Sequence, residues 1–307
     1  MTQTRIALEC LASAGIEEKF QLNAVRTSGD EKKKRFNPAE GSFADRINSM
    51  IINGEIDIGV HSLKDLPADI SQELEIAVVP RRGSRLDCLL GPGPFFRLPT
   101  GSRIGTSSQR RAAQALRLRR DIMIRPLRGN VGTRTDAVVQ GRVDAALLAM
   151  AGLERLKFVP PDGIRMYPLS LDYFVPAAGQ GAIAVVCRRG YLERSVRERA
   201  TDRQCIGEIE IERALLRALS AGCNSPLGIS AVSFGRGYTV RIQMLSPDGS
   251  SEARLTRTVR TGDGTGSILS DFRPIAREKL GGSVSCLNGK GRGRSTLSAQ
   301  GREIRNC

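Results

Sequence analysis

One cysteine, Cys223, lies in a segment whose residues favour an exposed turn, where a thiol could react. The segment RALSAGCNSPLG, residues 217–228, places it between the end of a helical apolar pattern and a run of Asn, Ser, Pro and Gly. Free cysteine is more often a small buried hydrophobe, whereas Gly and Pro mark turns. Because the thiolate is a nucleophile, the position suits attachment of a group, but an ordinary surface turn remains the simpler interpretation of these residues alone.

Three polar segments follow apolar runs of strand length, where open parallel sheets bind their ligands. The segment around Arg110 and Arg111 also begins a helix, whose first N–H groups are free to bind an anion. Two arginines there oppose the helix dipole, which is easier to explain if an anion lies beside them. A hydrated loop explains any one segment equally well, whereas three together favour a ligand site. The segments are His61–Asp65, Gly105–Arg111 and Leu127–Arg134.

The chain is strongly basic, with 47 Lys and Arg against 32 Asp and Glu and a formal charge of +15. Between Thr100 and Arg134 there are nine arginines, no lysine and one acid, Asp121. Arginine pairs with carboxylate or phosphate through two parallel hydrogen bonds. Nucleic acid is the alternative partner, but aromatic residues make up only 4% of the chain, which leaves little for bases to stack on. The composition favours an acidic small molecule.

Composition also limits the class of protein. The 307 residues are 40% apolar and 26% charged, as in globular proteins with two or three domains. The sequence predicts no membrane span and no secretory signal in MTQTRIALECLASAG. Seven scattered cysteines and a single histidine predict no metal site. We therefore expect a cytoplasmic protein with reduced thiols.

Strand and helix patterns alternate between residues 43 and 188, which is typical of parallel α/β units. The predicted strand 56–60 runs directly into the polar segment at His61. After Arg203 the order changes to one helix followed by hairpin strands with Gly turns, which predicts a separate α+β domain. Residues 288–307 are rich in Gly, Arg and Ser, so we expect a disordered tail.

Six motifs together point to one protein family. They are GEIDIGVHSLKDLP, GTSSQRRAAQAL, LRGNVGTR, DAALLAMAGLERL, PAAGQGAIAVVCR and ERALLRALSAGCNSPLG. In this order they resemble the hydroxymethylbilane synthase family, also called porphobilinogen deaminases, over roughly residues 20–235. The resemblance implies an α/β fold with two doubly wound, periplasmic-binding-protein-like α/β domains and a C-terminal α+β domain. The implied domains are residues 1–82 with 180–200, residues 86–175, and a cofactor-attachment domain at 204–287.

The resemblance also implies a transferase that carries one covalent dipyrromethane on Cys223 through a thioether. Four porphobilinogen molecules would add to this primer with release of ammonia, and water would then release the linear tetrapyrrole. Asp65 would be the catalytic carboxylate, holding pyrrole N–H groups and stabilising positive charge as ammonia leaves. Cationic side chains would pair with the carboxylates of cofactor and substrate. The implied cofactor ligands are Lys64, Ser108, Arg110, Arg111, Arg128 and Gly129, and the implied substrate ligands are Arg134, Arg155 and Gln180.

Two departures from the family pattern concern the N-terminal part of the chain. The family begins with a strand and a TR-S-LA loop, whereas MTQTRIALECLASAG matches the following helix, so we expect the first strand and its ligands to be missing. Glu40 stands where the family has a carboxylate-binding lysine, with Lys32–Arg35 nearby in the sequence. From these departures we expect weak or no activity. The alternative is a non-catalytic two-domain anion-binding protein. We also expect a monomer. We expect His61 to be a hydrogen-bonded structural histidine.

Overall fold

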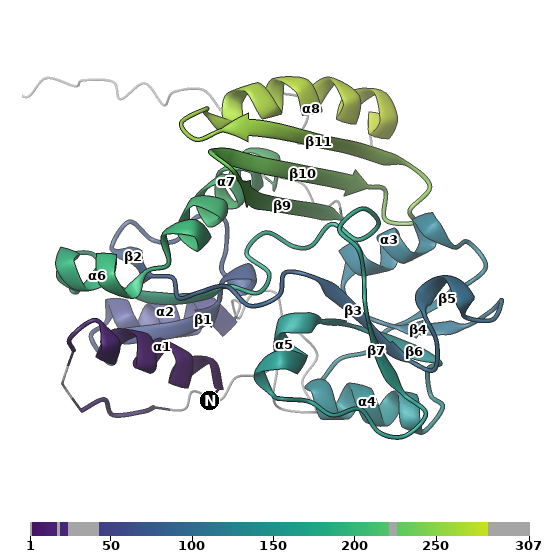
Figure 1. Cartoon of the computed structure of the whole chain (residues 1–307), viewed down its shortest axis with the longest axis horizontal. Helices are drawn as coiled ribbons and strands as arrows, with labels where there is room; N and C mark the ends of the chain where they lie inside the picture. Colours follow the sequence, from purple (N-terminus) through teal and green to yellow (C-terminus); the bar gives the residue numbers. More distant parts are fainter. Residues whose placement is uncertain (1, 17–18, 24–42, 221–225, 282–307) are drawn as a thin grey trace, which may run out of the picture.

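Three sheets, each covered by helices, make up the described part of the chain (Figure 1). The computed structural model describes residues 2–16, 19–23, 43–220 and 226–281. Cys223, Glu40, Lys32–Arg35 and the predicted tail 288–307 lie outside these ranges.

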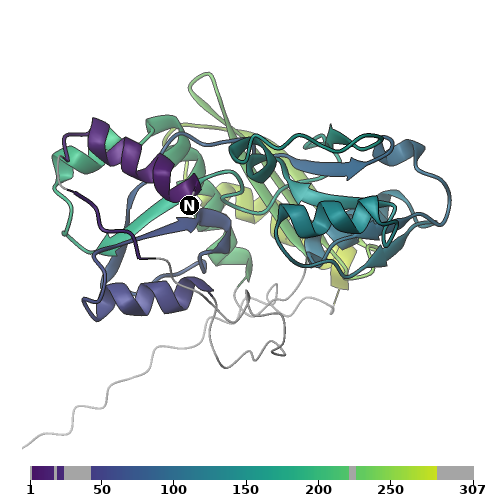
Figure 2. The same cartoon turned by 90° about the horizontal axis from the view of Figure 1, so that it is seen from below.

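The first sheet has the strand order β1-β8-β2, from β1 (Ile58–Ser62), β8 (Ile183–Arg188) and β2 (Leu74–Val78). The middle strand, β8, is antiparallel to both neighbours. Its alternate residues pack on opposite faces: Ala184 and Val186 on the side of α2, Val185 and Cys187 on the side of α1. Figure 2 shows these two helices on opposite sides of the sheet. The covering helices are α1 (Thr2–Ser13), α2 (Phe43–Ile52) and α6 (Arg194–Ala200).

The second sheet has five strands in the order β5-β4-β6-β3-β7. The pairs β4–β5 and β4–β6 are parallel, whereas β3 is antiparallel to β6 and β7. Its strands are β3 (Asp87–Gly91), β4 (Arg103–Gly105), β5 (Met123–Arg125), β6 (Ala145–Ala149) and β7 (Arg165–Pro168). Its helices are α3 (Gln109–Leu118), α4 (Val131–Val139) and α5 (Met150–Arg155).

The third sheet is an antiparallel meander, β11-β10-β9, packed against two long helices. This confirms the α+β domain that the hairpin pattern predicted. Its elements are α7 (Arg203–Ser220), β9 (Leu227–Phe234), β10 (Gly237–Leu245), β11 (Glu252–Arg260) and α8 (Thr265–Leu280).

Two crossovers connect the α/β sheets, at residues 79–86 and 169–182. Each crossover leads into the strand that runs against its neighbours, β3 in the second sheet and β8 in the first. The prediction of α/β architecture is therefore confirmed, but the expectation of purely parallel units is wrong for one strand of each sheet. That strand enters from the other domain, so its direction is reversed.

Candidate active site

A one-turn 3-10 helix, η2 (Leu63–Asp65), directly follows β1 and carries Lys64 and Asp65. The second crossover holds this turn in place, because the Leu63 amide donates to the Ala182 carbonyl at 3.0 Å. Gly179, at φ +75°, lies so close that a Cβ there would be 2.1 Å from the Leu63 side chain. Leu63 is buried and Asp65 is exposed. The turn is thus anchored through Leu63 and presents the carboxylate outward.

The surroundings of this turn shift the pKa of both of its titratable side chains, Lys64 and Asp65. Burial lowers the pKa of Lys64 to about 8, and the nearby Arg111 acts in the same direction while Asp65 opposes it. The surrounding protein displaces part of the water around the Asp65 carboxylate and thereby raises its pKa, and Lys64 and Arg111 oppose that rise. One carboxylate therefore lies among several cations, which suits a site that binds acidic groups and stabilises positive charge.

Arg110 and Arg111, from the first turn of α3, converge on the fully buried carboxylate of Asp87. Arg110 Nη1 lies 2.6 Å from Asp87 Oδ2, and Arg111 donates to Oδ1 at 2.8 Å. Gln180 Nε2 also donates to Oδ1, at 2.9 Å. Burial alone would raise the pKa of Asp87, but the two guanidinium groups hold it below its usual range. These four side chains, which we call the Asp87 cluster, join β3, α3 and the second crossover.

Three of the predicted ligands are members of the Asp87 cluster. In this structure Arg110, Arg111 and Gln180 are buried and have internal hydrogen-bond partners, so their contact with a ligand stays a prediction. Ser108, another predicted ligand, is the N-cap of α3, where its hydroxyl accepts from the Arg111 amide at 3.4 Å. Sequence reasoning missed Asp87. Its only signal is an acid beside the apolar run CLLG.

The loop before α4 and the first turn of that helix offer two further cations, Arg128 and Arg134. Arg128 is exposed, and within the described ranges no hydrogen bond or ion pair involves it. Gly129, at φ +109°, has no room for a Cβ, which would lie 2.8 Å from Thr133. The Gly129 carbonyl accepts from Arg134 Nε at 2.9 Å. Burial lowers the pKa of Arg111, and the charge of Arg134 acts in the same direction, so the start of α4 lies within electrostatic reach of the Asp87 cluster.

A cavity of about 890 Å³ runs along β1 and reaches both α/β domains. Asp65 lines it from the first domain, and Val131, Gly152 and Arg155 line it from the second. Arg155, at the end of α5, is half-buried and donates to the Gly181 carbonyl of the second crossover. The structure therefore brings Asp65 and Arg155, which are 90 positions apart in the sequence, to one cavity.

The residues that flank the Cys223 loop contact the same region. On one side, Arg213 of α7 donates to the carbonyls of Pro67 and Ala68, at 3.0 and 2.8 Å, just beyond the Asp65 turn. On the other side, the Ile229 amide of β9 donates to the Pro176 carbonyl at 2.8 Å. The helix before the Cys223 loop and the strand after it thus each contact a segment next to the site.

Two buried glutamates of α7 connect this helix to the crossovers. Glu212 pairs with Arg82 at 2.9 Å and accepts from the Gly179 amide at 2.7 Å. Glu208 pairs with Arg85 at 2.8 Å. Because a buried charge without a partner is costly, these pairs hold the third domain firmly against both crossovers.

Comparison with known proteins decides the family. A family model described as "Porphobilinogen deaminase, dipyromethane cofactor binding domain" matches residues 1–195. The chain belongs to the porphobilinogen deaminase family. The porphobilinogen deaminase of Thermus thermophilus is 38% identical over 266 residues, 83% of this chain and 84% of that one. A probable porphobilinogen deaminase of Methanothermobacter thermautotrophicus is 36% identical over 259 residues, 83% of this chain and 88% of that one.

Solved structures give only distant likenesses. A periplasmic binding protein of an ABC transporter from Brucella ovis, with glutathione bound, is 17% identical and covers 71% of this chain and 61% of that one, with a TM-score of 0.35. A solute-binding protein from Pseudomonas putida F1, with bound D-glucuronate, is 13% identical and covers 71% and 76%, with a TM-score of 0.33. The assignment to the porphobilinogen deaminase family therefore rests on sequence.

Membership of the porphobilinogen deaminase family makes the chain a transferase whose cofactor is dipyrromethane. No group of His, Cys, Asp and Glu in the described ranges could hold a metal ion. None of the helices that the structure describes is long and apolar enough to cross a membrane.

Proposed function

We propose that Asp65 is the catalytic carboxylate of the hydroxymethylbilane synthase reaction, the activity of this family. In that reaction four porphobilinogen molecules condense stepwise on a Cys-linked dipyrromethane with release of ammonia, and hydrolysis then frees the linear tetrapyrrole. The observation that carries the proposal is the position of Asp65: an exposed carboxylate at the end of β1, lining a cavity beside cations from both α/β domains.

Arg155 lines this cavity together with Asp65, and further cations lie beside the Asp65 turn, which fits an acidic cofactor. Dipyrromethane, when bound, supplies the pyrrole carbon to which the first substrate is joined. The carboxylates of cofactor and substrate match the cations of the site, and charge-assisted hydrogen bonds are the strong ones. Ser108, the Gly129 backbone and Gln180 would line the cleft. The proposed carboxylate-binding residues are Lys64, Arg110, Arg111, Arg128, Arg134 and Arg155.

Asp65 would act on charge and orientation. Its carboxylate would accept hydrogen bonds from pyrrole N–H groups and so orient the ring, and its charge would stabilise the positive charge that develops as ammonia leaves. A fixed negative charge beside the ring favours the transition state, in which the positive charge of the ammonium group moves onto the pyrrole. Lys64, one residue earlier, would pair with a substrate carboxylate and leave the reacting ring to Asp65.

Cys223 is the proposed anchor of the cofactor. Its sulfur would hold the cofactor through a thioether. The contact of Arg213, in the helix before its loop, with the carbonyl of Pro67 supports an anchor near the Asp65 turn.

Intact mass tests the anchor and the activity together. The purified chain should carry the mass of one dipyrromethane, and limiting porphobilinogen should add further increments of one pyrrole unit. Cys223→Ser should lose all added mass while keeping its circular dichroism spectrum. Cofactor mass retained by Cys223→Ser would refute this anchor, and increments without ammonia release would refute the reaction.

A second candidate is a family member with weak turnover. It is favoured by the described part of the first sheet, where one edge of β1 has no paired strand although Asp65 follows that strand. Turnover comparable with that of the Thermus thermophilus enzyme under the same conditions would refute it.

We further propose that the enzyme is a cytoplasmic monomer without a nucleic-acid partner. A reducing compartment keeps the proposed anchor thiol free, and the arginines have small acidic ligands to pair with. Light scattering should give the mass of one chain. Salt-sensitive binding of a DNA duplex at physiological ionic strength would contradict the proposal that the enzyme has no nucleic-acid partner.

A further inference from the structure

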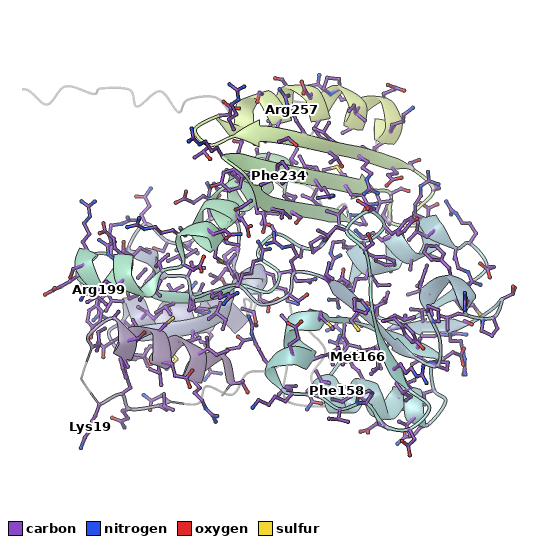
Figure 3. The ribbon with its side chains drawn as sticks, in the orientation of Figure 1. Lys19, Phe158, Met166, Arg199, Phe234 and Arg257 are labelled. Carbon is purple, nitrogen blue, oxygen red and sulfur yellow. The ribbon has the colours of Figure 1, made fainter. Side chains whose placement is uncertain are left out.

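The third domain contacts the second domain through buried polar side chains next to the Asp87 cluster. Helix α3, whose first turn carries Arg110, lies against one end of β10 (Figure 1). Gln114 of α3 is fully buried, and Gln243 of β10 is only 2% exposed. Figure 3 shows the labelled Phe234, which is exposed, near the opposite end of the same sheet. The two glutamines therefore mark the end of the sheet at which the second and third domains meet.

Hydrogen bonds connect these side chains from one domain to the other. Arg110 Nη1 donates to Gln114 Oε1, one helical turn later, at 3.0 Å. Gln114 Nε2 donates to Gln243 Oε1 at 2.6 Å, and Gln243 Nε2 donates to Glu252 Oε1 of β11 at 2.7 Å. We call Arg110, Gln114, Gln243 and Glu252 the interdomain network. Because Arg110 also pairs with Asp87, the network links the Asp87 cluster to two strands of the third sheet.

The groups around the two amides fix which way each amide points. A guanidinium group only donates, so the atom of Gln114 that faces Arg110 must be the oxygen. The Val175 carbonyl only accepts, and it lies 2.7 Å from the other end of the same amide, which must be the nitrogen. Gln243 must then present its oxygen to Gln114 and its nitrogen to the Glu252 carboxylate. Every N–H group of the interdomain network thus points toward the third domain.

The interdomain network helps to fix the plane of the Arg110 guanidinium. Arg110 Nη1 has three acceptors: Asp87 Oδ2 at 2.6 Å, the Val175 carbonyl at 2.9 Å and Gln114 Oε1. Gln114 binds both Arg110 and the Val175 carbonyl, so a change in its orientation would disturb both. Because a planar guanidinium pairs with a carboxylate in a defined geometry, a rotation of Arg110 would weaken its bond to a ligand carboxylate.

Pairing as complete as this is not general among the buried polar groups of the chain. The sequence predicted a hydrogen-bonded structural histidine at His61, but among the described residues its Nε2 has no partner, which corrects that prediction at this atom. Gln114 and Gln243, in contrast, each use both the oxygen and the nitrogen of the amide. Apolar side chains of similar size would fill the same space without the cost of burying polar groups. The two glutamines therefore indicate a role beyond filling the domain boundary.

We propose that Gln114 is a positioning residue for Arg110, and that Gln243 of the third domain sets the orientation of Gln114. Gln114 acts through Arg110, and thus on the carboxylates of the growing pyrrole chain. The domain whose α7 and β9 flank the Cys223 loop thereby aligns a cation of the second domain. The inference rests on the proposed function in one respect, that Arg110 is a ligand of the cofactor.

The rate of chain elongation tests the proposal on the full 307-residue protein. Intact mass after rapid quenching gives the rate at which pyrrole units are added from porphobilinogen. Gln114→Met keeps the length of the side chain and removes both hydrogen-bonding ends, so addition should slow by about tenfold. Gln204→Met, at an exposed glutamine in the first turn of α7, is the matched control and should match the parent. A lower melting temperature with unchanged elongation in Gln114→Met would make the residue merely structural and overturn the proposal.

A double variant shows whether Gln114 acts through Arg110. The combination of Arg110→Leu and Gln114→Met should elongate no more slowly than Arg110→Leu alone, because both changes affect the same group. Multiplied effects would show that Gln114 acts elsewhere and would refute the proposal. Slow elongation in Arg110→Leu beside normal elongation in Gln114→Met would refute this proposal alone. Normal elongation in Arg110→Leu would refute the ligand role of Arg110 itself, and the proposal with it.

An exchange of charge within the third domain tests the link to Gln243, even if Arg110→Leu does not fold. Gln243→Glu places a second carboxylate beside Glu252, and the repulsion should disturb Gln114 and slow elongation by about tenfold. Adding Glu252→Gln removes the repulsion and keeps the direction of every hydrogen bond, so elongation should return to within about twofold of the parent. Equal rates in Gln243→Glu and the exchanged pair would show that the third domain does not orient Gln114, and would overturn the proposal.

Discussion

The two α/β domains share one strand arrangement, but their polar side chains differ in burial and in pairing. In the second domain Asp87, Arg110 and Arg111 are buried and mutually paired, and β6 has a strand on each side. In the first domain Asp65 is exposed, and among the described residues His61 Nε2 has no partner and β1 is paired on one side only. The comparison indicates that the two domains have different roles. The buried, paired side chains of the second domain stabilise the fold, whereas the first domain presents the reactive carboxylate.

The largest expected effect comes from removing the buried carboxylate of the Asp87 cluster. Asp87→Ala leaves two buried guanidinium groups without their carboxylate, so we expect a loss of about 3–5 kcal/mol in the free energy of unfolding. Urea unfolding followed by circular dichroism measures it. The matched control is Asp144→Ala, which removes a half-exposed partner of Arg103 in the same domain and should cost about 1 kcal/mol or less. Equal losses would show that the Asp87 cluster stabilises the fold no more than the half-exposed Arg103–Asp144 pair does.

The next effect concerns the exposed carboxylate of the first domain. Asp65→Asn keeps the shape of the side chain and removes the charge, so turnover should fall by about 100-fold or more, with unchanged unfolding. Ammonia release in a single turnover gives the rate. Asp69→Asn, an exposed acid four residues later, is the control and should stay within about twofold of the parent. A similar loss in both variants would assign Asp65 a merely structural role.

Two arginines of the second domain should separate binding from stability. Arg128→Leu removes an exposed cation and should raise KM by about tenfold, because a charged hydrogen bond to the ligand is lost. Its melting temperature should not change. Arg110→Leu, in contrast, breaks the buried pair with Asp87 and should lower the melting temperature. Because Arg110 is also a proposed ligand, Arg110→Leu should stall chain elongation as well, and an unchanged melting temperature would show that its pair with Asp87 contributes little to stability.

The smallest effect is a pH dependence at Lys64. Burial and the charge of Arg111 lower its pKa to about 8, so the side chain is protonated below that pH and neutral above it. Between pH 8 and 9 the charged fraction falls from about one half to about one tenth, so KM should rise by about fivefold. Lys64→Arg stays charged and should flatten this part of the profile. An unchanged slope in Lys64→Arg would assign the titration to another group.

The sequence sufficed for features that depend on neighbouring residues. Alternating patterns predicted the strands and helices, and the position of Asp65 after an apolar run predicted a carboxylate at the end of a strand. The sequence did not reveal that Arg110 and Arg111 share Asp87, because these residues are 23 and 24 positions apart and meet only through tertiary packing. An arginine pair in a helix turn looks the same whether its partner is a ligand or a buried aspartate. The antiparallel course of β3 and β8 was missed because direction depends on the crossovers.

The course of β8 also has a consequence for the order of folding during synthesis. Within the described residues β1 and β2 pair only with β8, so the first sheet cannot form until residue 188 has left the ribosome. The strands of the second sheet lie in the uninterrupted stretch 87–168, which emerges earlier than β8. Because domains fold as units while the chain is made, and pairings between distant residues are slow, the second domain folds first. The half of the protein that bears Asp65 then assembles late, on a neighbour that is already complete.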